Sequence, residues 1–116
     1  MSIEDYTIYC TKEQTRIAYE LGAPIGITLN AYENGVQLAS LGDNKYLWAV
    51  TTQQMIGWLR EKRLMFCPLY YGDSKYAIRI FVGYTCIYTT NIFPTYEQAE
   101  LAAIDKALHY LLEKEE

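Results

Sequence analysis

The chain has 116 residues, of which 51% are hydrophobic and 21% charged, and its net charge is −4. This length predicts a single domain, 1–116, that buries roughly two-thirds of its unfolded surface without a disulfide or a metal. The acidic balance argues against a nucleic-acid binder, because such proteins neutralise phosphates with lysine and arginine. No apolar run approaches the roughly 20 residues of a membrane span, and the start lacks the charged and apolar regions of a signal peptide. We therefore expect a cytoplasmic protein.

The motif Thr-x-x-Gln occurs three times, beginning at Thr11, Thr51 and Thr95. A threonine hydroxyl at a helix N-cap accepts a hydrogen bond from the backbone N–H three residues on, and the glutamine can reach back to the N–H of the cap. The three copies therefore predict three helix starts. The segments that follow them do not match, so the motif does not indicate a duplicated unit.

The first helix is expected over residues 12–21, because Gly22 stands at the usual C-terminal position and Pro24 forbids continuation. Residues 25–31 then show the alternation of a half-buried strand. Asn34-Gly35 predicts a two-residue hairpin turn. That turn pairs Glu33 with Val36, Ala31 with Leu38, and Leu29 with Ser40, which places Leu29 and Ala31 on one face with Val36 and Leu38.

After a turn at residues 42–44, a third strand is expected over 46–50 and a second helix from Thr51 to about Arg63. Gly57 lies in the middle of that helix, where it costs about 1 kcal/mol relative to alanine. Either a close approach by a strand or simple tolerance would explain it.

Three further strands are expected over residues 64–71, 76–82 and 83–90, and the last and longest helix follows Thr95. Pro68 makes the first of these strands an edge strand or a bulged one, because proline has no N–H for the ladder. The order of elements predicts an α+β fold. We expect one two-layer domain with a mostly antiparallel sheet of about 5–6 strands and three helices on one face.

Cys10, Cys67 and Cys86 are odd in number, widely spaced and without a Cys-x-x-Cys motif. This pattern predicts reduced, buried thiols and no metal or disulfide. The single histidine, His109, has no catalytic motif near it and is expected to be a half-exposed helix residue. We assign no catalytic, cofactor-binding or metal residue and predict that the protein is not an enzyme. A pair of carboxylates that meets only in the fold stays open.

Tyrosine is the unusual feature of the composition, with 12 residues against 3 phenylalanines. Three interpretations are open: tyrosine serves as a strand residue on a wet sheet face, it forms a protein interface, or it stacks on bases. Tyr70 and Tyr71, close to a turn and near Arg79 across the expected hairpin, are the first candidate patch.

A second candidate patch is Trp58 with the basic residues that follow it. Arg60 and Arg63 lie at the end of the expected helix, where cations suit the helix dipole. Trp58 could be a core residue or an exposed anchor. The candidate interaction surface therefore consists of Trp58, Arg60, Arg63, Tyr70, Tyr71 and Arg79.

Three stretches carry a family resemblance: residues 9–24, residues 51–62 and residues 95–100. Together they resemble small uncharacterised proteins of gut Bacteroides-type bacteria and of their phages and mobile elements. The likeness covers about a third of the positions, and Cys67-Pro68 departs from the strand expected after the middle helix. The resemblance carries no activity and no catalytic residue, and it implies a small, phage-borne cytoplasmic accessory protein.

Three function classes follow. We favour a non-enzymatic protein-binding module, such as a regulator or inhibitor encoded by a mobile element. It would bind an unknown protein partner, with self-association through an edge strand near Pro68 as a variant. The second is a small-ligand or nucleotide sequestering protein that uses tyrosine stacking and the phosphate-binding residues Arg63 or Arg79. The third is a small enzyme built around His109 or two carboxylates.

Overall fold

A computed structural model describes residues 8–33 and 35–115 of the chain. These residues contain three helices and eight short antiparallel strands, which confirms the α+β class and the number of helices. The described strands form three small sheets, so the prediction of one sheet of about 5–6 strands is wrong. The chain divides into two compact units, Met1–Thr51 and Thr52–Glu116. The single domain 1–116 stays a prediction.

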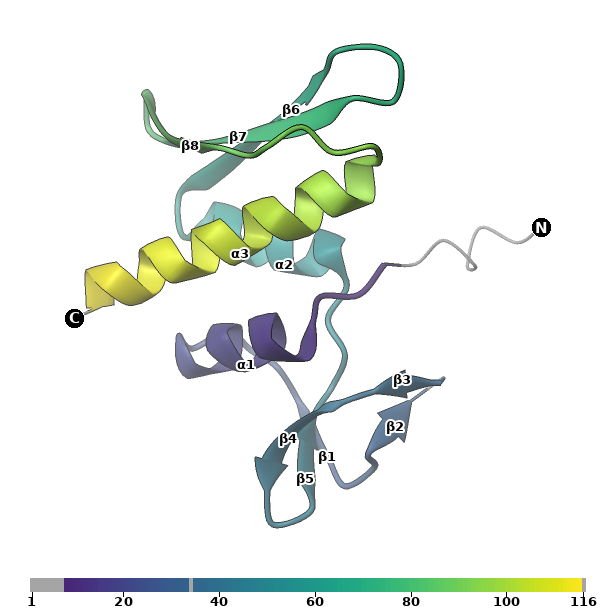
Figure 1. The fold of residues 1–116 in the computed structure, drawn as a ribbon. Coiled ribbons are helices and arrows are strands. Elements are labelled where there is room, and N and C mark those ends of the chain that lie inside the picture. The colour runs from purple at the N-terminus through teal and green to yellow at the C-terminus, as the bar shows by residue number, and fades with distance from the viewer. Residues whose placement is uncertain (1–7, 34, 116) are drawn as a thin grey trace. The chain divides into compact units, whose positions relative to one another are not determined.

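The first unit begins with a short helix and continues through five short strands (Figure 1). Its elements are α1 (Lys12–Glu20), β1 (Ile27–Thr28), β2 (Tyr32–Glu33), β3 (Val36–Gln37), β4 (Ala39–Gly42) and β5 (Lys45–Leu47). The predicted capping box is confirmed at α1. Thr11 Oγ1 accepts from the Gln14 N–H at 3.1 Å, and Gln14 Oε1 accepts from the Thr11 N–H at 3.1 Å. Gly22, with a φ of +98°, follows the helix end as expected.

The β2–β3 hairpin has the predicted register at its tip. Glu33 pairs with Val36, and the Leu38 N–H donates to the Ala31 carbonyl at 2.9 Å. Asn34 lies outside the described residues, whereas Gly35 has the expected positive φ of +79°.

The predicted pair of Leu29 and Ser40 is wrong. Asp43 and Asn44 both adopt left-handed φ angles, which builds a tight β4–β5 turn that pairs Gly42 with Lys45. A register shift between Ser40 and Gly42 then pairs Ser40 with Tyr46 instead. β1 pairs with the other edge of β5, so the sheet order is β1-β5-β4. Leu29 falls between β1 and β2 and is 75% exposed, so it does not share a buried face with Leu38.

A close contact explains one glycine of the first unit. The Trp48 N–H donates to the Gly26 carbonyl at 2.9 Å, beside the pairing of β1 with β5. A Cβ added to Gly26 would lie 2.8 Å from Trp48 Cδ1, so the indole ring occupies the space of a side chain. Gly57 in the second unit meets no atom within 4 Å, so tolerance and not a close approach accounts for it.

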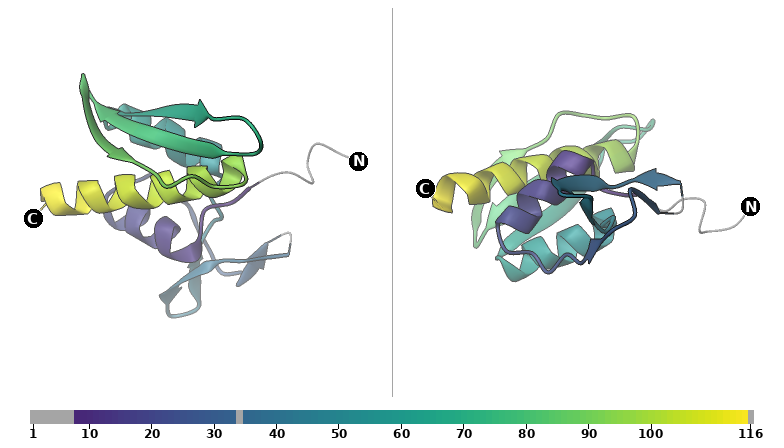
Figure 2. Two further views of the ribbon diagram at one scale, coloured as in Figure 1. Left: turned by 45° about the horizontal axis from the view of Figure 1, so that its top comes forward. Right: turned by 90° about the horizontal axis from the view of Figure 1, so that it is seen from below.

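The second unit is a three-stranded meander flanked in sequence by two helices. Its elements are α2 (Thr52–Glu61), β6 (Leu64–Tyr70), β7 (Tyr76–Val82), β8 (Thr85–Thr89) and α3 (Tyr96–Glu115). The sheet has the order β6-β7-β8, and α2 and α3 both lie on the same side of it (Figure 1). The right-hand view in Figure 2 looks at the sheet from the side of these helices. The helices on one face of a sheet agree with the prediction for this part of the chain.

The buried face of this sheet follows from its register. Leu64, Ile78 and Ile80 point to the helices and are at most 1% exposed. Leu59 of α2 and Ile104 of α3 are fully buried as well. Small alanines on α3 are also buried, namely Ala99, Ala103 and Ala107. Small side chains let a helix approach a sheet closely, so α3 lies along β7.

Pro68 lies inside β6, opposite Ile78. The Ile78 N–H donates to Thr90 Oγ1 at 2.9 Å, and the Ile78 carbonyl accepts from the Thr90 N–H at 3.0 Å. Both backbone groups of Ile78 therefore point away from β6. Because hydrogen-bonded pairs alternate along an antiparallel ladder, an N–H at position 68 would point to the open edge. β6 is thus an edge strand, one of the two predicted explanations of its proline.

The second and third helix starts lie where the Thr-x-x-Gln motifs predict them. α2 begins at Thr52 and α3 at Tyr96, and the Gln98 N–H donates to Thr95 Oγ1 at 3.2 Å. Among the described residues, no helix has the length and apolar character that a bilayer crossing requires.

Candidate functional site

The six residues of the predicted interaction surface lie at three places in the second unit. Trp58, Arg60 and Arg63 lie at the end of α2, whereas Tyr70 and Tyr71 lie at the far end of β6. The seven residues of β6 span roughly 20 Å at the rise of a β-strand. Arg79 lies in the middle of β7, paired with Cys67 and Thr89. The structure therefore groups these residues by element and does not bring them into one patch.

Trp58 is half-buried, and Lys62 Nζ lies 5.5 Å from the centroid of its ring. This cation–π contact covers part of the indole. Arg60 and Arg63 are exposed, and Arg63 ends the helix with a φ of +70° and an N–H that donates to the Arg60 carbonyl at 2.8 Å. The basic residues at the end of α2 thus have a structural role, because cations near a helix C-terminus interact favourably with the helix dipole.

Tyrosines gather at the end of the β6–β7 hairpin. Tyr70 and Tyr76 pair across the strands with ring centroids 5.0 Å apart, and Tyr96 meets Tyr76 edge-on at 6.4 Å. Tyr70 is nevertheless 65% exposed, and Tyr71 is 55% exposed. The two residues that the sequence nominated therefore offer aromatic surface to solvent.

The second unit leaves one face of its sheet uncovered by its own helices. Residues that alternate with the buried set point away from α2 and α3, although Ala77 at the hairpin end is only 1% exposed and its partner Leu69 is half-buried. We call the other members of this set the outer face: Met65, Cys67, Arg79, Phe81, Cys86 and Thr89. Met65 is 45% exposed and Phe81 is half-buried. Arg79 is exposed and is the one charged residue of this set, so the outer face is largely apolar with a single cation near its middle.

Two cysteines correct the prediction of buried thiols. Cys67 and Cys86 are both exposed, and Cys10 is half-buried. The outward position of Cys67 follows from the register of β6, which turns Phe66 and Pro68 to the helix side of the sheet, where Phe66 is half-buried and Pro68 is exposed. β7 separates the strands of Cys67 and Cys86, so their backbones lie roughly 10 Å apart, too far for a disulfide.

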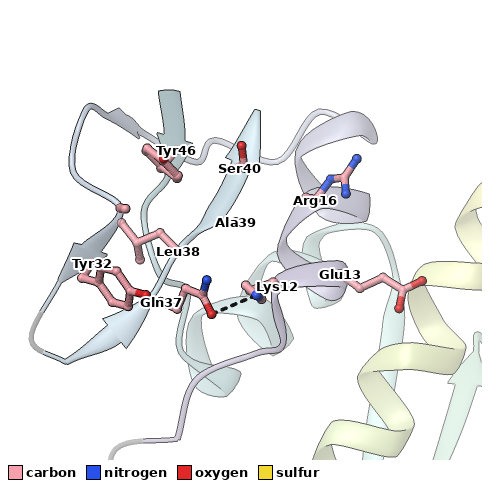
Figure 3. A pocket seen from close by; sticks show the side chains of 10 residues that line it. Lys12, Glu13, Arg16, Tyr32, Gln37, Leu38, Ala39, Ser40 and Tyr46 are labelled. Atoms are coloured by element: carbon pink, nitrogen blue, oxygen red, sulfur yellow. Dashed lines mark hydrogen bonds between the residues drawn. The ribbon is translucent and has the colours of Figure 1, made fainter. Parts of the chain in front are cut away.

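A cleft of about 650 Å³ lies in the first unit between α1 and the strands (Figure 3). The helix contributes Lys12, Glu13 and Arg16 to its lining. The strands contribute Ala31, Tyr32, Gln37, Leu38, Ala39, Ser40 and Tyr46. Lys12 Nζ donates to Gln37 Oε1 at 3.1 Å and so links the helix to β3, whereas the Glu13 side chain extends away from the strands in Figure 3. We call this feature the α1–β4 cleft.

A second hollow of about 410 Å³ adjoins the α1–β4 cleft and shares Arg16 and Ser40 with it. Its other lining residues are Tyr19 and Glu20 of α1 together with Leu41 and Gly42 of β4. The two hollows together follow α1 along its exposed side.

His109 lies beside a smaller hollow of about 180 Å³ between β8 and α3. Its Nδ1 lies 2.7 Å from the Asp105 carbonyl and its side chain is 49% exposed, as expected for a half-exposed helix histidine. Lys106 Nζ lies 5.3 Å from the centroid of the Tyr88 ring in the same hollow. Within the described residues, no group of three or more metal-ligating side chains meets.

No family model, curated protein or solved structure matches the chain. The resemblance to small proteins of gut Bacteroides-type bacteria and their phages therefore stays a prediction, and the site rests on its own geometry.

Sequence reasoning missed two sets of residues. Met65 and Phe81 belong to the outer face, and alternation along their strands was the signal available. Lys12 and Arg16 of the α1–β4 cleft are spaced i,i+4, which places them on one helix face. Tyr32 had no comparable signal, because only the packing of the β2–β3 hairpin beside α1 brings it to the cleft.

Proposed function

We propose that the protein is a non-enzymatic protein-binding module that docks a protein partner on its outer face. The observation that supports this function is the asymmetry of the second unit's sheet. Its two helices cover one face, while the other exposes Met65, Arg79 and the edge of Phe81. An apolar sheet face rimmed by polar residues is typical of a protein interaction site.

The composition of the outer face indicates the chemistry of the partner. Methionine adapts its shape to an opposing surface, and aromatic residues and arginine are enriched at the energetic centres of interfaces. Arg79 would require a carboxylate opposite it, because an arginine buried without a partner is costly. We therefore expect an apolar partner surface that carries an acidic residue. Two copies of the outer face would bring like charges together, so we favour a different protein over self-association here.

Tyr70 and Tyr71 are exposed at the hairpin end, but Tyr70 lies on the helix side of the sheet against Tyr76 and is not part of the outer face. The cytoplasmic, mobile-element setting of a regulator or inhibitor is part of the same proposal. An enzyme built on His109 has less support, since its hollow gathers only Lys106, two tyrosines and Glu113 besides apolar residues.

The test uses the exposed thiols of the outer face. A photo-crosslinker attached to Cys67 or Cys86 should capture a specific protein from host lysate, which is then purified for calorimetric titration. Met65→Lys and Arg79→Glu should each weaken the binding of that purified protein about 10-fold or more, as truncations of interface centres do.

Matched controls make the same charge changes elsewhere. Tyr84→Lys, at a fully exposed turn residue, and Lys75→Glu, in the β6–β7 turn, should leave affinity within about 2-fold. Equal affinity for the outer-face variants and the wild type would overturn the proposal.

A further inference from the structure

The α1–β4 cleft combines two kinds of side chain that nucleotide sites use, cationic and aromatic. The α1 side is lined by Lys12, Glu13 and Arg16, and the strand side by the rings of Tyr32 and Tyr46. Lys12 reaches toward the strands, whereas the Arg16 guanidinium is turned away from them (Figure 3). We propose that this cleft binds a small anionic ligand with a flat ring, of the nucleoside phosphate class. The cations would hold the phosphates, and the tyrosines would stack on the base. This site lies in the first unit and goes beyond the outer face proposed above.

The two cations are placed for an anion. Lys12 and Arg16 are exposed and one helical turn apart, so they lie on the same face of α1. Lys12 Nζ donates only to a neutral amide across the cleft, Gln37 Oε1 at 3.1 Å. A phosphate oxygen would replace that amide with a charge-assisted hydrogen bond, which is shorter and stronger. Glu13 also lines the cleft, and in Figure 3 its side chain extends away from the strands, as the Arg16 guanidinium does, so Lys12 is the cation that faces the strands.

The aromatic side is equally specific. Tyr32 is 62% exposed on a strand of two residues, although folding alone gives no reason to leave so large a ring in solvent. Tyr46 is half-buried beside Ser40, its cross-strand partner. Rings of this kind stack on any base, because every base has a π-face. Leu38 and Ala39 are both 3% exposed and supply an apolar floor.

The size of the cleft fits the ligand class. Its volume of about 650 Å³ falls within the usual range for small-molecule sites, roughly 300–1,000 Å³. The adjoining hollow continues past Arg16 and gives room for a second ring beside Tyr19, whereas its Glu20 disfavours a chain of phosphates there. Arg63 and Arg79, which the sequence suggested for phosphate binding, do not line these two hollows.

The experiment measures thermal stability and calorimetric binding of the full chain with ATP, ADP and AMP. Adenosine and inorganic phosphate are tested separately, because adenosine offers only the base for stacking and inorganic phosphate offers only the anion. We expect the nucleotides to raise Tm at millimolar concentration, because a ligand that binds the folded state stabilises it by mass action. Adenosine and phosphate alone should bind at least about 10-fold more weakly, and added NaCl should weaken nucleotide binding.

Arg16→Gln and Tyr32→Ala change exposed side chains, so the fold should tolerate both substitutions. Each should weaken nucleotide binding about 10-fold. The matched controls, Arg60→Gln and Tyr70→Ala, make the same changes at exposed positions of the second unit and should leave binding within about 2-fold.

Three results would overturn the proposal. The first is no shift of Tm and no heat of binding at millimolar nucleotide. The second is binding that the two cleft variants leave unchanged. The third is binding of an acidic peptide at this cleft in place of any nucleotide. None of these results changes the effect expected of Met65→Lys and Arg79→Glu on protein binding. The nucleotide proposal and the protein-binding proposal can therefore fail independently.

Discussion

At the scale of single residues, Tyr96 and Glu100 form a polar contact within α3 of the second unit. Glu100 is only 7% exposed on the inner side of α3, and the Tyr96 hydroxyl donates a hydrogen bond to it one helical turn away. Burial first, and then the negative charge of Glu100, raise the pKa of Tyr96 above its usual 10.0. The phenol therefore keeps its proton to a higher pH in the folded protein than in the unfolded chain.

This contact predicts a pH dependence of stability. A group whose pKa is raised by folding contributes its full stabilisation below the unfolded pKa, here 10.0, and loses it as pH rises through the folded pKa. The free energy of unfolding of Tyr96→Phe should therefore fall less steeply than that of the wild type between about pH 9 and pH 11. At pH 7 the variant should be less stable by roughly 1–3 kcal/mol, because buried Glu100 loses a donor.

Urea unfolding across this pH range measures both effects. Tyr84→Phe is the control, since Tyr84 is fully exposed and its replacement should keep the slope of the wild type. Parallel slopes for Tyr96→Phe and the wild type would contradict the proposed linkage.

At the scale of elements, the edge of β6 is the feature with the clearest consequence. The outward-pointing N–H groups of an edge strand are a template for pairing with another chain. Pro68 removes one of these donors in the middle of the strand, on the side that faces away from Ile78. Self-association through this edge, which the sequence suggested, stays a prediction and would have to proceed without that hydrogen bond.

Pro68→Val should therefore increase self-association, because it restores the outward donor and adds a residue that favours strands. Sedimentation velocity over a range of concentrations measures the change. Pro24→Val, outside the sheets, is the control and should behave as the wild type does. If Pro68→Val sediments like the wild type at every concentration, Pro68 does not prevent self-association through the edge of β6.

At the scale of the whole molecule, large buried side chains concentrate in one of the two units. The largest fully buried side chains among the described residues lie within Thr52–Glu116, with the single exception of Leu47. Burial of apolar surface is the main source of folding free energy. We therefore expect residues 52–116 to fold alone with a cooperative thermal transition and residues 1–51 to lack one.

Circular dichroism and calorimetry of the two separate segments test this expectation. Retained helix content with a sharp transition in 52–116 alone would make the second unit an independent domain. If neither segment unfolds cooperatively but the full chain does, this result supports the prediction of one domain over 1–116.

Local signals accounted for much of the fold. The Thr11 capping box, the three helix starts, the β2–β3 turn and the strands around Pro68 lie where the sequence predicted them. These features depend on residues within a few positions of one another, so local chemistry is sufficient to place them. The candidate site was less predictable, because the sequence did not decide whether Tyr70 is exposed, and Tyr70 and Arg79 are both exposed but lie apart.

The sequence by itself determined where each helix begins, which turns reverse the chain and that the strand with Pro68 is either an edge strand or a bulged one. Only the tertiary structure decided that the strands form three small sheets, that Cys67 and Cys86 face solvent, and that Tyr32 and Tyr46 meet Arg16 at one cleft. The physical reason is the distance along the chain between the groups that interact. Caps and turns are set by neighbouring backbone groups, whereas strand pairing and exposure depend on contacts between segments far apart in the chain.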